Sequence, residues 1–169
     1  MTEHEATEAA GPPRDEREAL MMRLGGLSFA VYADEVECVT EWAEPTPLPH
    51  AHAPVLGVVS VRGRMRTVLH PPRLFEALGL VFDRRPDECA FVASLAGDEQ
   101  LALAFDTGRP VPVTPDYLSA PPDSPALPLR ATFSRYGETV YVLDPARLFD
   151  AAMSGTERRR QRAVSREER

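Results

Sequence analysis

The chain has 169 residues, of which 43% are hydrophobic, and its formal net charge is −7. A chain of this length buries about 70% of its unfolded surface, so it needs neither disulfides nor a structural metal for stability. Its negative charge argues against nucleic acid as the principal partner, since phosphate binding needs a concentrated positive field, and no apolar run approaches the roughly 20 residues of a membrane span.

Both ends of the chain have the composition of tails. Residues 1–18 contain six acids against two arginines and have no apolar period, so we expect a disordered acidic tail. Residues 154–169 hold six arginines against three acids and are expected to extend a C-terminal helix or to form a solvated tail. Binding to nucleic acid or anionic lipid is the alternative for this arginine run. A single folded domain is therefore expected at residues 19–153.

Four β-hairpins are predicted between the tails, because short runs of β-branched and aromatic residues flank glycine-containing turns. In chain order they span Leu20–Tyr32, Val55–Leu69, Cys89–Phe105 and Leu129–Leu143. A short helix is expected to begin at Pro71 and to stop at Gly79. Cys38 and Cys89 are expected to be buried thiols in a reducing compartment, which makes the protein cytoplasmic.

One stretch of the chain occurs twice, at an offset of 74 residues. The sequence VLHPPRLFEA at 68–77 returns as VLDPARLFDA at 142–151, and from Gly57 and Ala131 onward the gapless alignment holds nine identities in 21 positions. Related units with short strands and frequent turns favour a mostly β fold of two pseudo-duplicated closed barrels. Phe75 and Phe149 are then expected to occupy equivalent packed positions.

Residues 44–54 contain four prolines in eleven positions and must run extended. We expect this linker to carry the chain from one barrel to the other. His50 and His52 could bind a metal if His70 or Cys38 converged on them, but no paired CxxC spacing accompanies them, and no metal site is predicted.

The common enzyme signatures GxxxxGK[ST], GxGxxG, GxSxG and HExxH are missing from the chain. Asp106, Asp144 and Asp150 could pair for acid–base chemistry, but strand ends and helix caps are the favoured roles, because aspartate bonds local backbone donors. The sequence therefore favours a non-catalytic binding module over an enzyme.

The run VLGVVSVRGRMRTVL at 55–69, followed by Arg73, resembles the signature of the CheW chemotaxis coupling proteins. In that family a hydrophobic strand ends in an Asn-Leu-Arg-Gly turn and returns into a Val-Ile-Asp-Leu-Arg segment. Further similarity at 24–31, 36–39, 45–49, 104–106 and 142–148 makes the match span about residues 20–152.

The resemblance implies a CheW-like fold: two SH3-like five-stranded β-barrel subdomains with short helices and a C-terminal helix. It implies an adaptor without cofactor that couples the cytoplasmic tips of chemoreceptors to the regulatory domain of a CheA-type histidine kinase. Such a protein is recruited to membrane-associated arrays without inserting into the membrane, and nucleic acid is not a partner. A divergent scaffold used in another pathway is one alternative, and a nucleic-acid binder with an arginine tail is the other.

By the same resemblance, five residues are expected at or near a receptor-binding groove between the barrels: Glu37, Gly57, Val58, Arg62 and Gly63. The alternative for Arg62 is a structural salt bridge to Glu37 or Asp106, and the two roles are compatible. No kinase-binding residues are predicted.

The chain departs from the family pattern at four positions. Ser60 replaces the usual Asn, and His70 replaces the usual Asp. For His70 a buried or capping imidazole is the favoured role, with titration near neutral pH as the alternative. Pro110 and Pro112 fall in a valine-rich element that leads toward the kinase contact in the family, and each removes a backbone donor.

Overall fold

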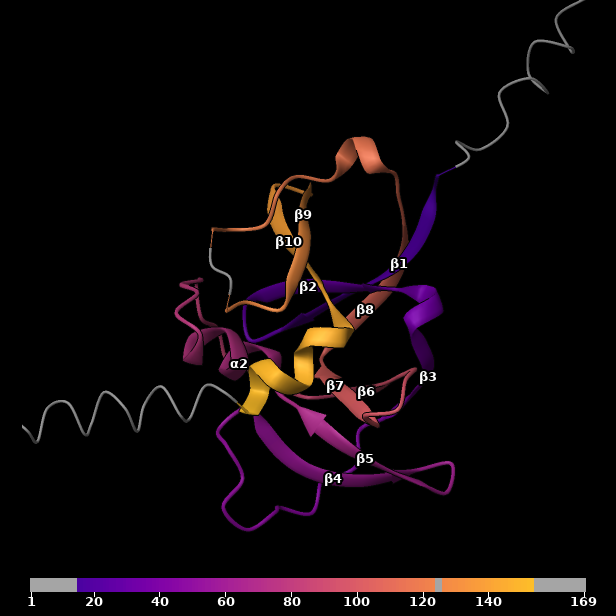
Figure 1. Ribbon diagram of the computed structural model, residues 1–169, viewed down its shortest axis with the longest axis vertical. Coiled ribbons are helices and arrows are strands. Elements are labelled where there is room, and N and C mark those ends of the chain that lie inside the picture. Colours follow the sequence, from indigo (N-terminus) through magenta and orange to yellow (C-terminus); the bar gives the residue numbers. More distant parts are fainter. Residues whose placement is uncertain (1–14, 124–125, 154–169) are drawn as a thin grey trace, which may run out of the picture.

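The computed structural model describes residues 15–123 and 126–153, and within them the chain forms two five-stranded sheets (Figure 1). Sheet A has the order β8-β1-β2-β10-β9 and sheet B the order β3-β6-β7-β5-β4. The strands of sheet A are β1 (Arg17–Leu24), β2 (Leu27–Tyr32), β8 (Thr107–Val113), β9 (Leu129–Arg135) and β10 (Glu138–Leu143). Those of sheet B are β3 (Val36–Glu41), β4 (Val55–Val61), β5 (Arg64–Leu69), β6 (Phe91–Leu95) and β7 (Leu101–Phe105).

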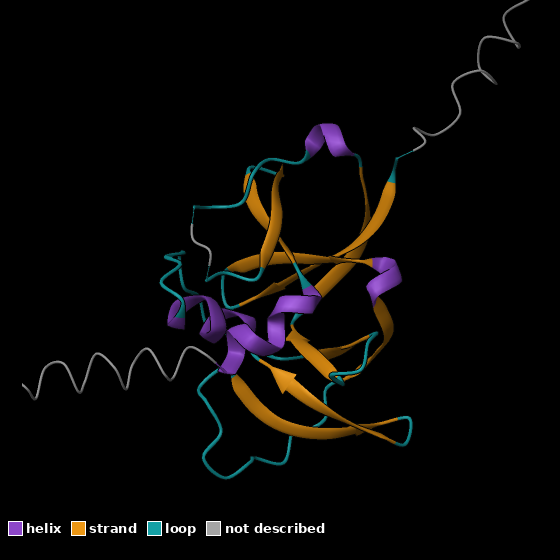
Figure 2. Ribbon diagram, viewed as in Figure 1, coloured by secondary structure: helices purple, strands orange, loops and turns teal. Residues whose placement is uncertain are grey.

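Short helices lie between strands and after the last strand (Figure 2). They are α2 (Pro71–Ala77), the 3-10 turns η1 (Ala33–Glu35) and η2 (Pro115–Tyr117), and a C-terminal helix at residues 145–153. No helix in the described part of the chain is long and apolar enough to cross a membrane.

Each sheet closes on itself through one isolated bridge. Thr46, downstream of the edge strand β3, exchanges two backbone hydrogen bonds of 2.9 Å with Val58 on the opposite edge strand β4. Ser119, downstream of β8, pairs in the same way with Thr132 on β9. Val58 and Thr132 are again 74 residues apart. The prediction of a mostly β fold with two duplicated five-stranded barrels is confirmed, and the closed sheets A and B are called barrel A and barrel B below.

The two barrels exchange hairpins along the chain. The β1–β2 hairpin pairs with β10 and β8 in barrel A, although it precedes barrel B in sequence. Two parallel strand pairs hold the exchanged hairpins in place. In barrel A, β10 pairs with β2, with Tyr141 opposite Phe29, and in barrel B, β5 pairs with β7, with Thr67 opposite Leu101. The chain passes between barrels at η1 and at Asp106, whose backbone N–H donates to the Arg23 carbonyl at 2.8 Å.

The linker at residues 44–54 does not carry the chain between barrels, so that prediction is wrong. It joins β3 to β4, which are the two edges of the same sheet. Its extended, proline-rich backbone is used instead for the Thr46 bridge that closes barrel B. The backbone is extended around Thr46, but it turns at residues 48–51 and 52–55, where the N–H groups of Ala51 and Val55 donate to carbonyls three residues earlier at 3.3 and 2.9 Å, so the predicted extended conformation is present only in part. The spacing of the prolines contains no information on which strands they connect.

Strand β8 stays regular through its two prolines. Pro110 lies opposite Leu20 and Pro112 opposite Glu18 in the pairing with β1. The prolines are two residues apart, so their nitrogens point to the same side of the strand. Because β8 is an edge strand, it needs donors only on the side that faces β1, and prolines are tolerated on the other.

The main hydrophobic core fills barrel B and continues to the β1–β2 hairpin and the C-terminal helix, and a smaller core fills barrel A. Phe75 is fully buried and packs against Tyr141, with ring centroids 6.1 Å apart. Phe149 is 39% exposed, so the expected equivalence of the two phenylalanines is wrong. The C-terminal helix instead packs through Leu148 and Ala152, which are four residues apart and lie on the same helical face.

Cys38 and Cys89 are free thiols and only half-buried, which corrects the expectation of full burial. Desolvation raises the pKa of Cys89 to about 11. Strand β1 begins at Arg17, within the segment expected to be a tail, and residues 1–14 and 154–169 lie outside the described residues.

Candidate functional site

The β4–β5 hairpin ends in a two-residue turn formed by Arg62 and Gly63. Both residues have positive φ, 50° and 81°, which is the type I′ combination that matches the twist of hairpin strands. Val61 and Arg64 pair directly on either side of the turn. The backbone therefore holds Arg62 at the tip of the hairpin, with its side chain exposed.

Arg62 forms no ion pair with any residue that the structure describes, so the alternative of a salt bridge to Glu37 or Asp106 is not realised. Glu37 instead pairs with two other arginines of the same hairpin. One oxygen contacts Arg66, and the other lies 3.9 Å from Arg64. A guanidinium at a fixed turn without a counter-ion is available to a carboxylate on another molecule.

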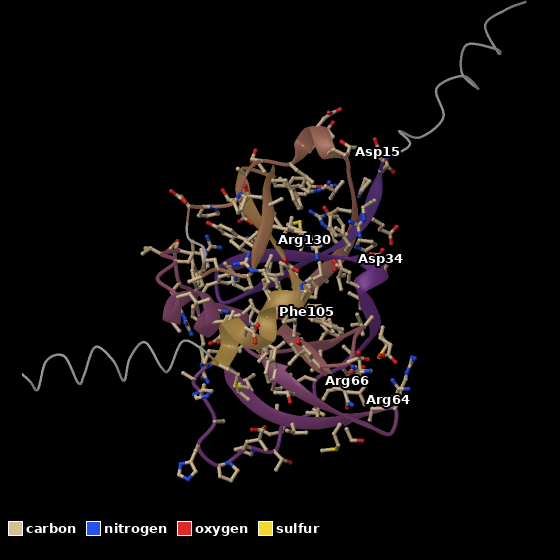
Figure 3. All side chains as sticks on the ribbon, in the orientation of Figure 1. Asp15, Asp34, Arg64, Arg66, Phe105 and Arg130 are labelled. Atoms are coloured by element: carbon tan, nitrogen blue, oxygen red, sulfur yellow. The ribbon has the colours of Figure 1, made fainter. Side chains whose placement is uncertain are left out.

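Arg66 is the most buried of these arginines, with only 3% of its side chain exposed. It donates to the Leu95 carbonyl at 3.0 Å and pairs with Glu37, while its Nε has no hydrogen-bond partner. Figure 3 shows Arg64 and Arg66 next to one another at the end of barrel B where the β4–β5 turn lies. Glu37 is thus the counter-ion of a buried guanidinium, and it remains 42% exposed itself.

Gly57 and Val58 lie at the other end of β4, where each has a structural role in the pairing with the linker. Gly57 has φ +142° at a register shift, and a Cβ there would stand 2.3 Å from the Thr46 carbonyl oxygen. Val58 makes both backbone bonds of the bridge to Thr46. Both residues allow the linker to close barrel B.

The five predicted residues are therefore divided. Arg62, Gly63 and Glu37 belong to one end of barrel B, whereas Val58 lies four residues from Arg62, about 13 Å along an extended strand. Two exposed residues beside the turn were not predicted: Arg64, with 68% of its side chain exposed, and Met65, which is 57% exposed. The alternation of arginines at 62, 64 and 66 was a signal for the first of them.

A cleft of about 320 Å³ lies where the β6–β7 turn meets the start of the C-terminal helix, lined by residues 95–101, 145 and 146. Beside it, Arg130 joins Glu35 of η1 to Asp144, at 2.8 and 3.4 Å (Figure 3). None of the five predicted residues lines this cleft.

His70 caps α2, as favoured from the sequence. Its Nδ1 accepts from the Arg73 backbone N–H at 3.2 Å, and its Nε2 contacts Asp87. Burial lowers the pKa of His70 despite the opposing influence of Asp87, so the ring is neutral at neutral pH. Asp144, at the equivalent position of the repeat, accepts from the Ala146 N–H at 3.2 Å, which is the capping role expected for it.

The metal alternative for His50 and His52 finds no support among the described residues, because no three histidine, cysteine or acidic side chains gather there. The arginine run that motivated the nucleic-acid alternative lies outside the described residues.

The chain is similar to known proteins in sequence and in fold. The family model of the CheW-like domain matches residues 18–153. The chemotaxis protein CheW of Rhizobium meliloti (strain 1021) is 38% identical over 53 residues, which are 31% of this chain and about a third (34%) of that relative. The scaffolding protein TtCheW from Thermoanaerobacter tengcongensis has a similar fold, with a TM-score of 0.60 at 14% identity over 75% of this chain and 88% of that one.

Proposed function

Because the chain belongs to the CheW-like domain family, we propose that it is a non-catalytic adaptor coupling the cytoplasmic tips of chemoreceptors to the regulatory domain of a CheA-type histidine kinase. The observation that carries this proposal is the extent of the match, which includes every strand of both barrels except the first residue of β1. An adaptor needs two separate binding faces, and a duplicated barrel supplies them. The proposed location is the cytoplasm, at membrane-associated receptor arrays.

The receptor contact is proposed at the tip of the β4–β5 hairpin. Arg62 presents five donors from a rigid turn and has no counter-ion among the described residues, so pairing with a receptor carboxylate breaks no existing bond. Met65 beside it supplies exposed apolar surface for a helical receptor tip. Gly63 permits the turn, and Glu37 positions the hairpin through Arg66. Gly57 and Val58 act indirectly by closing barrel B.

Calorimetric titration with a receptor cytoplasmic fragment tests this contact. Arg62→Glu is expected to weaken receptor binding by at least about tenfold, or 1.4 kcal/mol. Arg85→Glu is the matched control, because Arg85 is also exposed and has no ion pair with a described residue, but belongs to the loop after α2. Equal receptor affinity for wild type and a folded Arg62→Glu variant would reject the assignment.

A second titration, with the regulatory domain of the CheA-type kinase, tests the adaptor role itself. Saturable binding at about micromolar affinity or tighter is expected, and Arg62→Glu is expected to leave it unchanged. If neither the receptor fragment nor the kinase domain binds the folded protein, the adaptor function is rejected. No residue of this chain is assigned to the kinase contact.

A further inference from the structure

A second hairpin tip, in barrel A, carries chemistry that the proposed function does not use. Tyr136 and Gly137 connect β9 to β10 with φ values of 53° and 74°, the same turn as Arg62 and Gly63, one repeat length of 74 residues later in the chain. Tyr136 is 72% exposed. A large aromatic side chain at positive φ on a hairpin tip is costly for the fold, so its position calls for a reason.

Two arginines converge on this ring. The guanidinium carbon of Arg109, from β8, lies 4.6 Å from the ring centroid, and that of Arg135, from β9, lies 5.4 Å away. Neither arginine forms an ion pair with a residue that the structure describes, and the Nε of Arg135 is buried without a hydrogen-bond partner. Hydrogen bonding to Arg135 and the positive charges of both arginines lower the pKa of Tyr136.

The adjoining cleft, of about 410 Å³, is lined by Met21, Arg23, Arg109, Tyr136 and Glu138 among others. Glu138 does not neutralise Arg109 or Arg135, because it pairs with Arg23 and accepts from the Ser28 hydroxyl at 3.1 Å. The cleft and its rim thus hold three arginines and one acid and have a positive net charge. The folded body around them, residues 19–153, has a net charge of −6.

We propose that the surface formed by Arg109, Arg135 and Tyr136 binds an acidic segment of a partner protein. Carboxylates of that segment pair with the two guanidinium groups, an apolar side chain packs on the Tyr136 ring, and a further side chain enters the cleft over Met21. This contact goes beyond the proposed receptor site, because it lies on the other barrel.

Charge favours a protein over a nucleic acid as the partner. A polyphosphate chain needs a continuous positive track, whereas this surface has two uncompensated arginines within an acidic body. Two separate arginines beside an aromatic ring are better suited to a peptide whose carboxylates are spaced by apolar residues.

The probe is a fluorescein-labelled peptide of alternating glutamate and leucine, with a glutamine–leucine peptide as its neutral control, added to the full chain. Fluorescence anisotropy is expected to detect the glutamate peptide, with an affinity that falls as salt rises. The double variant Arg109→Gln/Arg135→Gln is expected to bind at least about tenfold more weakly. Arg85→Gln, in the exposed loop after α2, is the control and is expected to bind as wild type does.

Nuclear magnetic resonance of the arginine Nε–H groups locates the binding. Shifts at Arg109 and Arg135 that saturate with the peptide support the proposal, and circular dichroism verifies that the variants are folded. Shifts confined to arginines at 158–169, or equal affinity for wild type and double variant, overturn it. Tighter binding of a single-stranded DNA oligonucleotide at the same arginines also overturns it. Because the receptor proposal rests on Arg62 in barrel B and this one on Arg109 and Arg135 in barrel A, failure of either proposal leaves the other standing.

Discussion

Replacing Glu37 by glutamine separates a structural role of this side chain from a purely surface one. Arg66 is 3% exposed, and Glu37 is its ion-pair partner. Glutamine keeps the shape but leaves the guanidinium with the Leu95 carbonyl as its one remaining partner among the described residues. Removing one member of a buried ion pair costs about 3–5 kcal/mol. Because Glu37 itself is 42% exposed, water can partly replace it, and we expect a loss of about 2 kcal/mol.

Urea unfolding followed by circular dichroism measures this loss. With a slope of about 2 kcal/mol per molar urea, the midpoint of Glu37→Gln is expected to fall by about 1 M. Arg64→Gln is the matched control, since Arg64 is 68% exposed and 3.9 Å from Glu37, and its loss should stay below about 1 kcal/mol.

The double variant Glu37→Gln/Arg66→Met completes the cycle. Methionine removes the buried charge and keeps an unbranched apolar side chain, so the double variant is expected to be more stable than Glu37→Gln alone. Equal midpoints for Glu37→Gln and Arg64→Gln would refute the reasoning, because the burial of Arg66 would then have no energetic consequence.

Three further predictions concern stability. In urea unfolding, Phe75→Ala should cost about 3–5 kcal/mol and Phe149→Ala less than about 1 kcal/mol, and similar losses at both would contradict the packing described above. Gly57→Ala should lower the melting temperature more than Gly63→Ala, because its Cβ would meet a backbone oxygen at 2.3 Å whereas the space around Gly63 is open. Since burial holds the pKa of His70 below 6.5, the unfolded state takes up its proton first as pH falls, so stability is complete above pH 6.5 and declines below it. Unfolding free energies from about pH 8 to about pH 5 should show this decline, and His70→Asn, which can still cap α2, should reduce it. An unchanged pH profile in that variant would exclude His70 as the cause.

Local features of the fold were predictable from the sequence because their causes are local. The turn at Arg62 and Gly63 followed from a glycine between β-branched runs, and α2 followed from Pro71 after a capping residue. The exchange of hairpins between barrels did not follow. It depends on parallel contacts such as Thr67 opposite Leu101, and strand periodicity contains no information on which strand lies beside which.

The candidate site was predicted unevenly for the same reason. The exposed position of Arg62 depends only on its turn, whereas the ion pair of Glu37 with Arg66 joins residues 29 positions apart, on strands β3 and β5. Phe149 repeats Phe75 in sequence but not in burial, because burial depends on the neighbours of each helix, and α2 and the C-terminal helix have different ones.

The two hairpin tips have the same turn but different chemistry. Both turns keep glycine at their second residue, Gly63 and Gly137, where an added side chain would be strained. Both place a larger side chain, Arg62 or Tyr136, at positive φ in the first residue, which costs about 1–2 kcal/mol relative to a residue that adopts this conformation freely. Glycine or asparagine would remove that cost without changing the turn. Arg62 has no ion pair among the described residues to offset this cost, and the contacts of Tyr136 are those with Arg109 and Arg135 in the surface proposed above. We infer that both side chains are kept for binding, and the different chemistry of the tips suits two different partners.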